Sequence, residues 1–261
     1  AKDLTGISPK YGEHRIELET GARPARQRQY RLNPKYSLMV KEDINKLLEA
    51  GFIYPVNNTE WVSPIVVVPK KKGPDGKVKI RVCQDYRKLN AATKKDYYPL
   101  PFTDMILDHV AGNEFYSFLD GFSGYNQVHI RLQDQLFTTF ITDWGTYAFN
   151  RMPFGLCNAP GTFQRLVMDI FWDFLKHFLE VFIDDFAVFS NRGGHLGFLR
   201  QTFQRCRETG LKLHPGKCFI GVERGVVLGH VVSNKGLEVD INKVKAILTL
   251  TPPKTMKEVR G

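Results

Sequence analysis

Two adjacent carboxylates, Asp184 and Asp185, lie between two short apolar runs at residues 181–183 and 186–189. Like charges side by side repel each other and resist removal from water, so such a pair is uncommon between strands that look buried. A divalent cation removes this repulsion, and carboxylate oxygens bind Mg²⁺ readily, usually together with substrate phosphates. The pair therefore indicates a metal site that handles phosphates.

The pair alone also fits an ordinary β-hairpin, because aspartate is a common turn residue. Short motifs match by chance, so the pair by itself gives phosphate chemistry odds of about one in three. A third carboxylate, Asp120, ends a predicted strand at residues 115–119. Three carboxylates from two strand ends are what a two-metal phosphoryl-transfer site requires, where one ion activates the attacking hydroxyl and the other stabilises the pyrophosphate.

The surrounding pattern predicts an α+β fold, because the strand pairs are mostly joined by tight turns and not by helices. On an antiparallel sheet of this kind, the end of the strand at 115–119 can lie beside the Asp184-Asp185 turn. Helices are expected at 36–50, 103–111 (capped by Thr103), 158–178, 195–209 and from about 241; strands are expected at 62–68, 78–83, 115–119, 136–141, 146–150, 180–190 (a hairpin), 218–222 and 226–232.

The composition describes a basic globular chain of 261 residues, 43% of them hydrophobic, with a net charge of +10. No apolar run reaches the roughly 18 residues of a membrane span, and no signal-peptide pattern is present. A basic surplus favours polyanionic partners, nucleic acid above all, although ribosomal and membrane-surface proteins share it. Arginines cluster at residues 23–31 and lysines at residues 70–72; either cluster could also be a solvated loop.

Several blocks of this sequence resemble motifs of reverse transcriptases and occur in the same order. They are RVCQDYRKLN at 81–90 (fingers), LDGFSGYNQ at 119–127 (first palm motif), RMPFGLCNAP at 151–160 (start of the long palm helix), FIDD at 182–185 (aromatic-x-Asp-Asp) and LGH at 228–230 (primer grip). The amino-acid sequences of these blocks are most similar to those of the gypsy group of long-terminal-repeat retrotransposons. The blocks span nearly the whole chain.

The resemblance implies the fingers and palm of a right-hand polymerase, with an antiparallel palm sheet backed by helices. It implies this division: a basic N-terminal arm at 1–35, mainly fingers at 36–114, palm at 115–130, mainly fingers at 131–160, palm with the primer grip at 161–236, and the truncated start of a thumb or connection at 237–261. The arm and the lysine cluster would contact template and primer phosphates without sequence preference.

The resemblance also assigns roles around the aspartates. Asp120, Asp184 and Asp185 would bind Mg²⁺, or Mn²⁺ in its place, with the backbone carbonyl of Gly121 as a further ligand. Tyr125 matches the aromatic residue that lies under the sugar and excludes a 2′-hydroxyl. Without the flanking motif, Tyr125 would be taken for an ordinary core tyrosine.

Further residues match positions around the incoming nucleotide. Arg81 and Lys71 match the fingers residues that hold the triphosphate, although Lys70 and Lys72 are alternatives to Lys71. Phe154 and Gly155 match residues beside the nucleotide, and Lys217 matches a lysine that protonates pyrophosphate, unless it is simply a surface lysine. The primer grip comprises Leu228, Gly229 and His230.

The expected function is therefore an RNA- and DNA-templated DNA polymerase that adds deoxynucleotides to a primer 3′-hydroxyl. Its partners would be an RNA or DNA template, a primer and deoxynucleoside triphosphates, with ribonuclease H and integrase regions downstream in a polyprotein and no membrane. Its place would be the cytoplasm, in virus-like particles, with access to the nucleus. Two alternatives remain: another palm-type templated polymerase, and a catalytically silent fragment or structural subunit.

Overall fold

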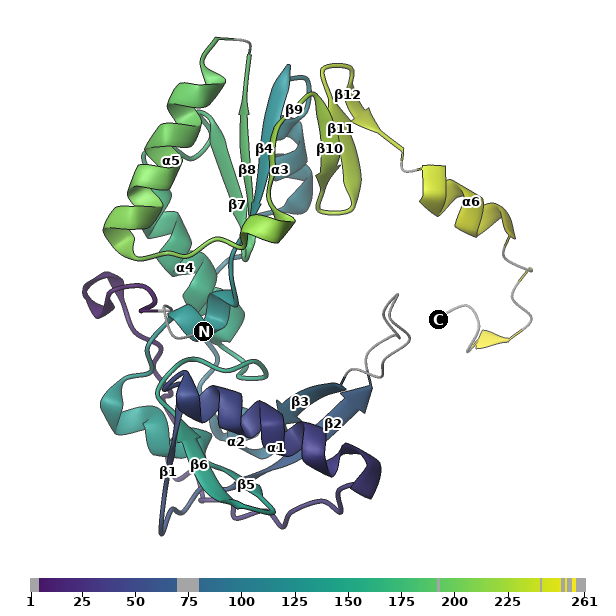
Figure 1. The fold of residues 1–261 in the computed structure, drawn as a ribbon. Coiled ribbons are helices and arrows are strands. Elements are labelled where there is room, and N and C mark those ends of the chain that lie inside the picture. Colours follow the sequence, from purple (N-terminus) through teal and green to yellow (C-terminus); the bar gives the residue numbers. More distant parts are fainter. Residues whose placement is uncertain are drawn as a thin grey trace.

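The computed structural model describes residues 5–69, 80–191, 193–239, 241–249, 252, 255 and 256. The predicted triphosphate contact Lys71 lies outside these residues, as do Lys70 and Lys72. Within them, the elements form two groups, one above the other in Figure 1. The helix α6 (Ile241–Thr249) lies to one side of both.

The lower group is built on a mixed five-stranded sheet. Its strands follow the order β1 (Ile53–Pro55), β6 (Gly145–Phe149), β5 (Phe140–Thr142), β2 (Ser63–Pro69) and β3 (Ile80–Gln84), and only the β2–β5 pair is parallel. The helices α1 (Pro34–Glu49) and α2 (Arg87–Ala92) and the 3-10 helix η3 (Leu132–Thr138) belong to this group. Asn33 caps α1 by accepting a hydrogen bond from the Lys35 backbone N–H at 3.0 Å.

The upper group is built on an antiparallel sheet of four strands. They follow the order β7 (Leu179–Phe182), β8 (Asp185–Ser190), β4 (Phe115–Asp120) and β9 (Phe219–Val222). A three-stranded sheet of β10 (Arg224–Val227), β11 (His230–Ser233) and β12 (Gly236–Glu238) lies beside it. The helices are α3 (Thr103–Val110), α4 (Ala159–Phe171) and α5 (His195–Thr209), with the 3-10 helices η2 (Gly124–Gln127) and η4 (Pro215–Lys217).

The two faces of the four-stranded sheet belong to different cores. Leu119, Phe186 and Val188 lie in one hydrophobic cluster with residues of α4 and α5. Tyr116 and Ala187 lie in a second cluster with residues of α3 and of the three-stranded sheet. Alternate residues of a strand point to opposite faces, so the sheet is covered on both sides. The two hydrophobic clusters therefore pack against β4 and β8 from both sides, and the aspartates lie at the ends of these strands.

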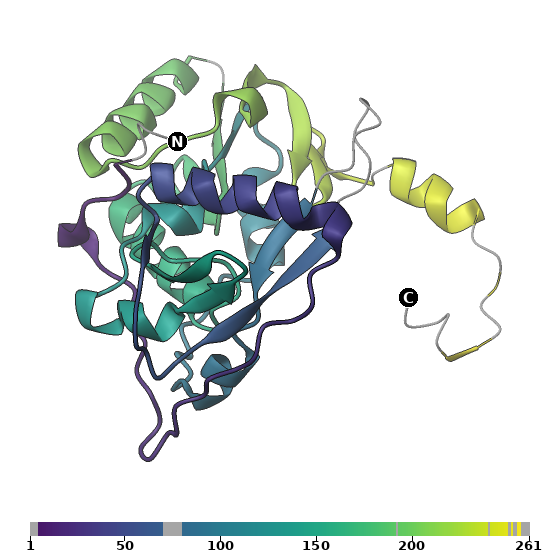
Figure 2. The same cartoon turned by 60° about the horizontal axis from the view of Figure 1, so that its bottom comes forward.

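The N-terminal arm connects the two groups. The Ile7 N–H donates to the Gln127 carbonyl at 2.9 Å and the Ser8 N–H donates to the Thr209 carbonyl at 3.2 Å. Further along the arm, the Gln27 N–H donates to the Val62 carbonyl at 2.9 Å. Between η1 (Pro9–Tyr11) and the start of α1 at Pro34, the arm has no helix and runs along the outside of the molecule, as Figure 2 shows.

The predicted α+β class with antiparallel pairing is confirmed, but four local predictions are wrong. The helix expected over 158–178 ends at Phe171, and the chain then turns, with Lys176 at φ 65°; Phe174 and Phe178 pack against each other there with tilted rings, 4.8 Å between ring centres. The strand expected over 226–232 is two strands, because Leu228 (φ 48°) and Gly229 (φ 76°) turn the chain back.

The two remaining errors concern shorter segments. The start of the strand expected at 136–141 belongs to the 3-10 helix η3, in which the Thr138 hydroxyl donates to the Gln135 carbonyl at 2.7 Å. Thr103 is the first residue of α3 and not its cap; the preceding Phe102 makes no side-chain capping bond. None of the described helices has the length and apolar character needed to cross a membrane.

Candidate active site

Strand pairing brings the three predicted aspartates to one corner of the upper sheet. Asp120, the last residue of β4, is the direct partner of Asp185, the first residue of β8. Asp184 lies in the turn before β8, and its carbonyl accepts a hydrogen bond from the Gly121 N–H at 2.9 Å. The predicted convergence of the two strand ends is therefore present, and backbone hydrogen bonds maintain it.

The turn that carries Asp184 has an unusual backbone. Ile183 has φ 54°, in the left-handed region that β-branched residues rarely adopt. Its N–H donates to Gln164 Oε1 at 2.6 Å, and Gln164 Nε2 donates to the Val181 carbonyl at 3.0 Å. Gln164 comes from α4 and is fully buried. The conformation of the turn thus depends on a side chain from a different element.

Burial and neighbouring carboxylates raise the pKa of two of the aspartates, Asp184 and Asp185. The pKa of Asp184 is raised to about 6, first by burial and then by the charges of Asp120 and Asp185. The pKa of Asp185 is also raised, by desolvation and by Asp120. Asp184 Oδ1 is buried and has no hydrogen-bond partner among the described residues. A buried carboxylate oxygen without a donor, beside two further carboxylates, suits a divalent cation that prefers oxygen ligands.

The corner is not a ready-made metal cage. No group of three or more His, Cys, Asp or Glu side chains within the described ranges is arranged to hold a metal ion as it stands. The Lys217 ammonium lies 3.2 and 3.1 Å from the two carboxylate oxygens of Asp120. The donor chemistry fits Mg²⁺, but Asp120 already has a cationic partner from η4.

Tyr125 lies next to Asp184 and packs in an aromatic group with Phe154 and Phe163. Its ring centre is 4.9 Å from that of Phe154 and 5.7 Å from that of Phe163. Burial and the nearby Asp184 raise its pKa to about 12, so its hydroxyl stays protonated. The ring is half-buried and Phe154 is 56% exposed, so this group is open on one side. The geometry suits a surface under a sugar or base.

Gly124 lets η2 approach the aspartates. A Cβ at this position would lie 2.9 Å from Asp184 Cγ and 2.9 Å from Phe163 Cζ, and still nearer to Asp184 Oδ1. Real Cβ atoms do not approach neighbours this closely, so only glycine fits. The next turn of chain is fixed by buried Gln127, whose Nε2 donates to the Phe122 and Lys212 carbonyls at 2.8 and 2.9 Å.

The remaining predicted nucleotide contacts lie around this aromatic group or on the other sheet. Gly155 has φ 96°, and its carbonyl accepts from Asn90 Nδ2 at 2.7 Å. The side-chain oxygen of Asn90, Oδ1, in turn accepts a hydrogen bond from the Cys157 N–H at 2.9 Å. Asn90 lies in α2, so α2 holds the segment from Gly155 to Cys157. Arg81 is exposed on β3 opposite Val68, and no described contact joins it to the aspartates.

A hollow connects the aspartates with part of the predicted primer grip. Asp120, Asp185, Lys217 and Leu228 line it together, and the other lining residues are Phe118, Leu119, Phe186, Phe219, Val226 and Val227. Leu228 and Gly229 form the turn between β10 and β11, where His230 is exposed. The turn predicted to grip the primer therefore borders the same hollow as the carboxylates, while Gly229 and His230 are not part of its lining.

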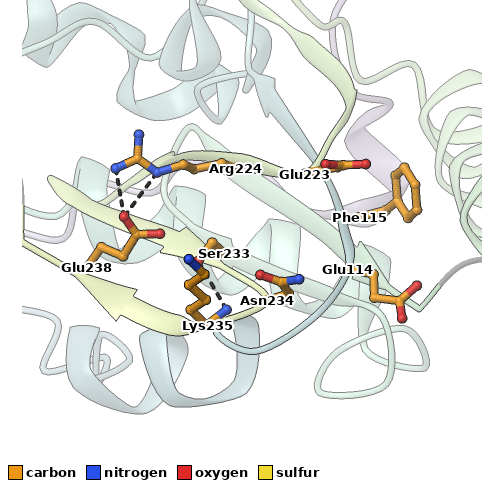
Figure 3. A pocket seen from close by; sticks show the side chains of 8 residues that line it. All are labelled: Glu114, Phe115, Glu223, Arg224, Ser233, Asn234, Lys235 and Glu238. Carbon is orange, nitrogen blue, oxygen red and sulfur yellow. Dashed lines mark hydrogen bonds and ion pairs between the residues drawn. The ribbon is translucent and has the colours of Figure 1, made fainter.

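A second hollow lies at the far end of β4, where Figure 3 shows its lining side chains. Phe115, the first residue of β4, lines this hollow, whereas Asp120 ends the strand. Its most defined contact is Arg224 donating to Glu238 Oε2 at 3.1 and 2.7 Å. A six-residue strand spans about 20 Å, so this hollow is separate from the aspartates.

The sequence-based analysis missed the residues that support the site. Gln164, Gln127 and Asn90 each use their side-chain amide to hold backbone near the predicted site residues. Gln164 gave one usable signal, since it is a polar residue on the apolar stripe of a helix between Phe163 and Val167. The amide partners themselves are distant in sequence and carry no local pattern.

The sequence model of the family described as reverse transcriptase (RNA-dependent DNA polymerase) matches residues 68–232. The retrovirus-related Pol polyprotein from transposon 297 of Drosophila melanogaster is 35% identical over 239 residues, which are 91% of this chain and 22% of that polyprotein. The corresponding polyprotein from transposon gypsy of the same organism is 33% identical over 241 residues, 91% of this chain and 23% of that one. The chain thus spans about a fifth of the length of these relatives.

Solved structures agree with the sequence comparison. The foamy viral protease-reverse transcriptase in complex with an RNA/DNA hybrid matches with a TM-score of 0.83 and 25% identity, over 95% of this chain and 33% of that one. Another foamy viral protease-reverse transcriptase structure, with double-stranded DNA, matches with a TM-score of 0.86 and 25% identity, over 99% of this chain and 44% of that one. This chain therefore belongs to the reverse transcriptase (RNA-dependent DNA polymerase) family.

Proposed function

We propose that this chain carries the polymerising site of an RNA- and DNA-templated DNA polymerase. The observation that carries the proposal is the pairing of Asp120 with Asp185 beside Asp184, which places three carboxylates at one corner of the sheet. Membership of the reverse transcriptase family supports the assignment, because this is the chemistry named for that family. The reaction is the attack of a primer 3′-hydroxyl on the α-phosphate of a deoxynucleoside triphosphate, with pyrophosphate leaving.

The carboxylates would hold Mg²⁺, or Mn²⁺ in its place, through Asp120, Asp184 and Asp185, with the Gly121 carbonyl as a further ligand. Bound there, the ion would supply a lowered pKa for the attacking hydroxyl and charge neutralisation for the phosphates. The raised pKa of Asp184 and its unpartnered Oδ1 support this assignment. Reverse transcriptases as a class are metal-dependent polymerases.

The neighbouring side chains would orient the substrates. Tyr125, packed against Phe154, would lie under the sugar and leave no room for a 2′-hydroxyl. The Lys217 ammonium, which lies beside Asp120, would give a proton to the leaving pyrophosphate. Arg81, on β3 of the lower group, would hold the triphosphate by a bidentate contact, and we propose Lys71 as a second contact through electrostatic attraction.

The proposed macromolecular partners are a template strand of RNA or DNA and a primer. The exposed arginines at positions 23, 26, 28 and 31 would contact backbone phosphates, so binding should weaken with added salt. The foamy viral structures hold an RNA/DNA hybrid and double-stranded DNA, which supports this proposal. The matched relatives are polyproteins, so we also propose ribonuclease H and integrase regions downstream, and action in cytoplasmic virus-like particles.

The test is primer extension on an RNA template with Mg²⁺, comparing the parent chain with Asp184→Asn. The matched control is Asp108→Asn, which removes an exposed carboxylate from α3 and should leave extension unchanged. Extension by Asp184→Asn at the parental rate would contradict the metal assignment. A parent chain that neither extends primers nor binds Mn²⁺ through Asp184 would contradict the proposed function and favour a silent subunit. Preference for ribonucleotides would indicate another palm-type polymerase.

A further inference from the structure

Gln164 is a fully buried polar side chain in an otherwise apolar part of α4. Its neighbours Phe163 and Val167 are both 0% exposed. A buried amide is costly unless both its donor and its acceptor find partners. The amide oxygen and the amide nitrogen of Gln164 both form hydrogen bonds with one short stretch of backbone, which indicates that this side chain has a specific structural role.

That stretch is the turn before the second strand of the aspartate hairpin. Gln164 Oε1 accepts from the Ile183 N–H at 2.6 Å, and Nε2 donates to the Val181 carbonyl at 3.0 Å. The two contacts lie on either side of Phe182, whose strand partner is Asp185. The amide therefore fixes the direction of the chain immediately before Asp184.

The conformation held in this way is unfavourable on its own. Ile183 adopts φ 54°, which strains a β-branched residue, and such strain persists only when the surroundings determine it. On the opposite side, the Gly121 N–H donates to the Asp184 carbonyl at 2.9 Å. Besides the β7–β8 pairing, the turn is thus held by Gln164 from α4 and by Gly121, which follows β4, and loss of the Gln164 amide removes one of these restraints.

We propose that Gln164 is a positioning residue of the candidate active site, whose amide holds the Ile183–Asp184 turn in its left-handed conformation and so orients the carboxylates of Asp184 and Asp185. The inference rests on the proposed function for its kinetic consequence, but not for its structural one. It adds a residue from a separate helix, outside the aspartate motifs, to the set on which polymerisation depends.

The first test is Gln164→Met, which keeps the length of the side chain and removes both hydrogen bonds. The matched control is Gln135→Met, since Gln135 is also buried and donates a single amide bond to the Ile130 carbonyl at 3.1 Å, in the lower group. Amide hydrogen exchange at Ile183 should accelerate in Gln164→Met and not in the control. Unchanged exchange at Ile183 would overturn the inference, whether or not the chain polymerises.

The second readout is kinetic and applies if the parent chain extends primers. A displacement of catalytic groups by about 1 Å costs up to about 100-fold in rate, so kcat should fall by about 10- to 100-fold in Gln164→Met. The KM for the nucleotide should stay within about threefold, because Arg81 and Lys71, the side chains proposed to hold the triphosphate, are untouched. A kcat equal to that of Gln135→Met would refute the positioning role. A parent chain that neither extends primers nor binds Mn²⁺ through Asp184 would instead refute the proposed function.

A conservative variant covers the case in which Gln164→Met does not fold. In the variant Gln164→Glu, the new carboxyl group can be protonated or ionised. The protonated form can accept from the Ile183 N–H and donate to the Val181 carbonyl, as the amide does, whereas the ionised form can only accept. Burial favours the protonated form, so the kcat deficit of this variant relative to the parent should shrink as pH falls from about 8 to about 6. A deficit that is independent of pH would count against the two-bond role.

Discussion

The Lys217 ammonium lies 3.1 and 3.2 Å from the two carboxylate oxygens of Asp120, and this contact joins η4 to the end of β4. The Lys217 side chain is 60% exposed and that of Asp120 is 24% exposed. The lysine therefore engages the same oxygens that a divalent cation would use. It is also flexible enough to leave them when such a cation binds, because most of its length is in solvent.

The first prediction follows from this competition. Lys217→Met should bind Mn²⁺ more tightly than the parent by up to about fivefold, because a partly exposed ion pair is worth at most about 1 kcal/mol. Electron paramagnetic resonance of free Mn²⁺ measures the affinity without any turnover. Lys212→Met, an exposed lysine five residues earlier, is the control for loss of one positive charge. Unchanged or weaker binding by Lys217→Met would argue against competition at Asp120.

The second prediction concerns sugar selection at Tyr125. Replacing the ring by a methyl group in Tyr125→Ala opens the space beside Phe154, so ribonucleotides should be incorporated about tenfold more readily relative to deoxynucleotides. Single-nucleotide incorporation with matched ribo- and deoxynucleotides measures the ratio. Tyr125→Phe keeps the ring and should keep the parental discrimination. Equal discrimination in Tyr125→Ala and the parent would show that another group excludes the 2′-hydroxyl.

The third prediction concerns Gly124. In Gly124→Ala, the new methyl group would have to displace the Asp184 carboxylate or the Phe163 ring, and overpacking of this kind typically costs about 1–3 kcal/mol of folding free energy. Primer extension should also fall, because Asp184 moves. Gly197→Ala is the matched control: Gly197 lies in α5 with nothing within 4 Å of the added Cβ, so the change should raise helix stability by about 0.5–1 kcal/mol. Denaturant unfolding and extension assays on both variants provide the comparison, and an active, stable Gly124→Ala would contradict the packing argument.

The fourth prediction concerns pH and the buried His14. This side chain is 1% exposed, and its Nδ1 lies 2.9 Å from the Thr162 hydroxyl. Burial lowers its pKa from 6.5 to about 4, more than Asp134 and Asp96 raise it. Because the folded pKa is below the unfolded one, the unfolded chain takes up the proton first as pH falls. The stability that His14 contributes is therefore complete above pH 6.5 and is lost as pH falls toward 4.

Denaturant unfolding at two pH values tests whether the free energy of unfolding decreases as the pH falls. Between about pH 7 and pH 5, protonation linked to His14 should remove roughly 2 kcal/mol of the free energy of unfolding. His14→Gln should lose less stability than the parent over the same interval, by about that amount. The exposed His177 is the control, and His177→Gln should follow the parent. A His14→Gln variant with the parental pH dependence would show that His14 is not the titrating group.

Much of the fold follows from local patterns. The short apolar runs at 115–119 and 186–189 predict strands, and the strands β4 and β8 lie there. Gly210, predicted to end the helix at 195–209, does so with φ 82°. The errors fall where tertiary contacts override such patterns. Phe174 and Phe178 continue the apolar helical period, yet they lie beyond the end of α4, where both are buried in the main hydrophobic cluster.

The sequence by itself determined the kinds of group at the site: three carboxylates at strand ends, an aromatic residue beside them, and basic residues on both sides. These depend only on residue type and on spacing along a few neighbouring residues. Only the tertiary structure decided which groups touch: Asp120 with Asp185 across a strand pair, Lys217 with Asp120, and Gln164 with the Ile183 N–H. Such contacts join residues 19 to 97 positions apart, and they form because both faces of the sheet are buried and therefore fix the strand register.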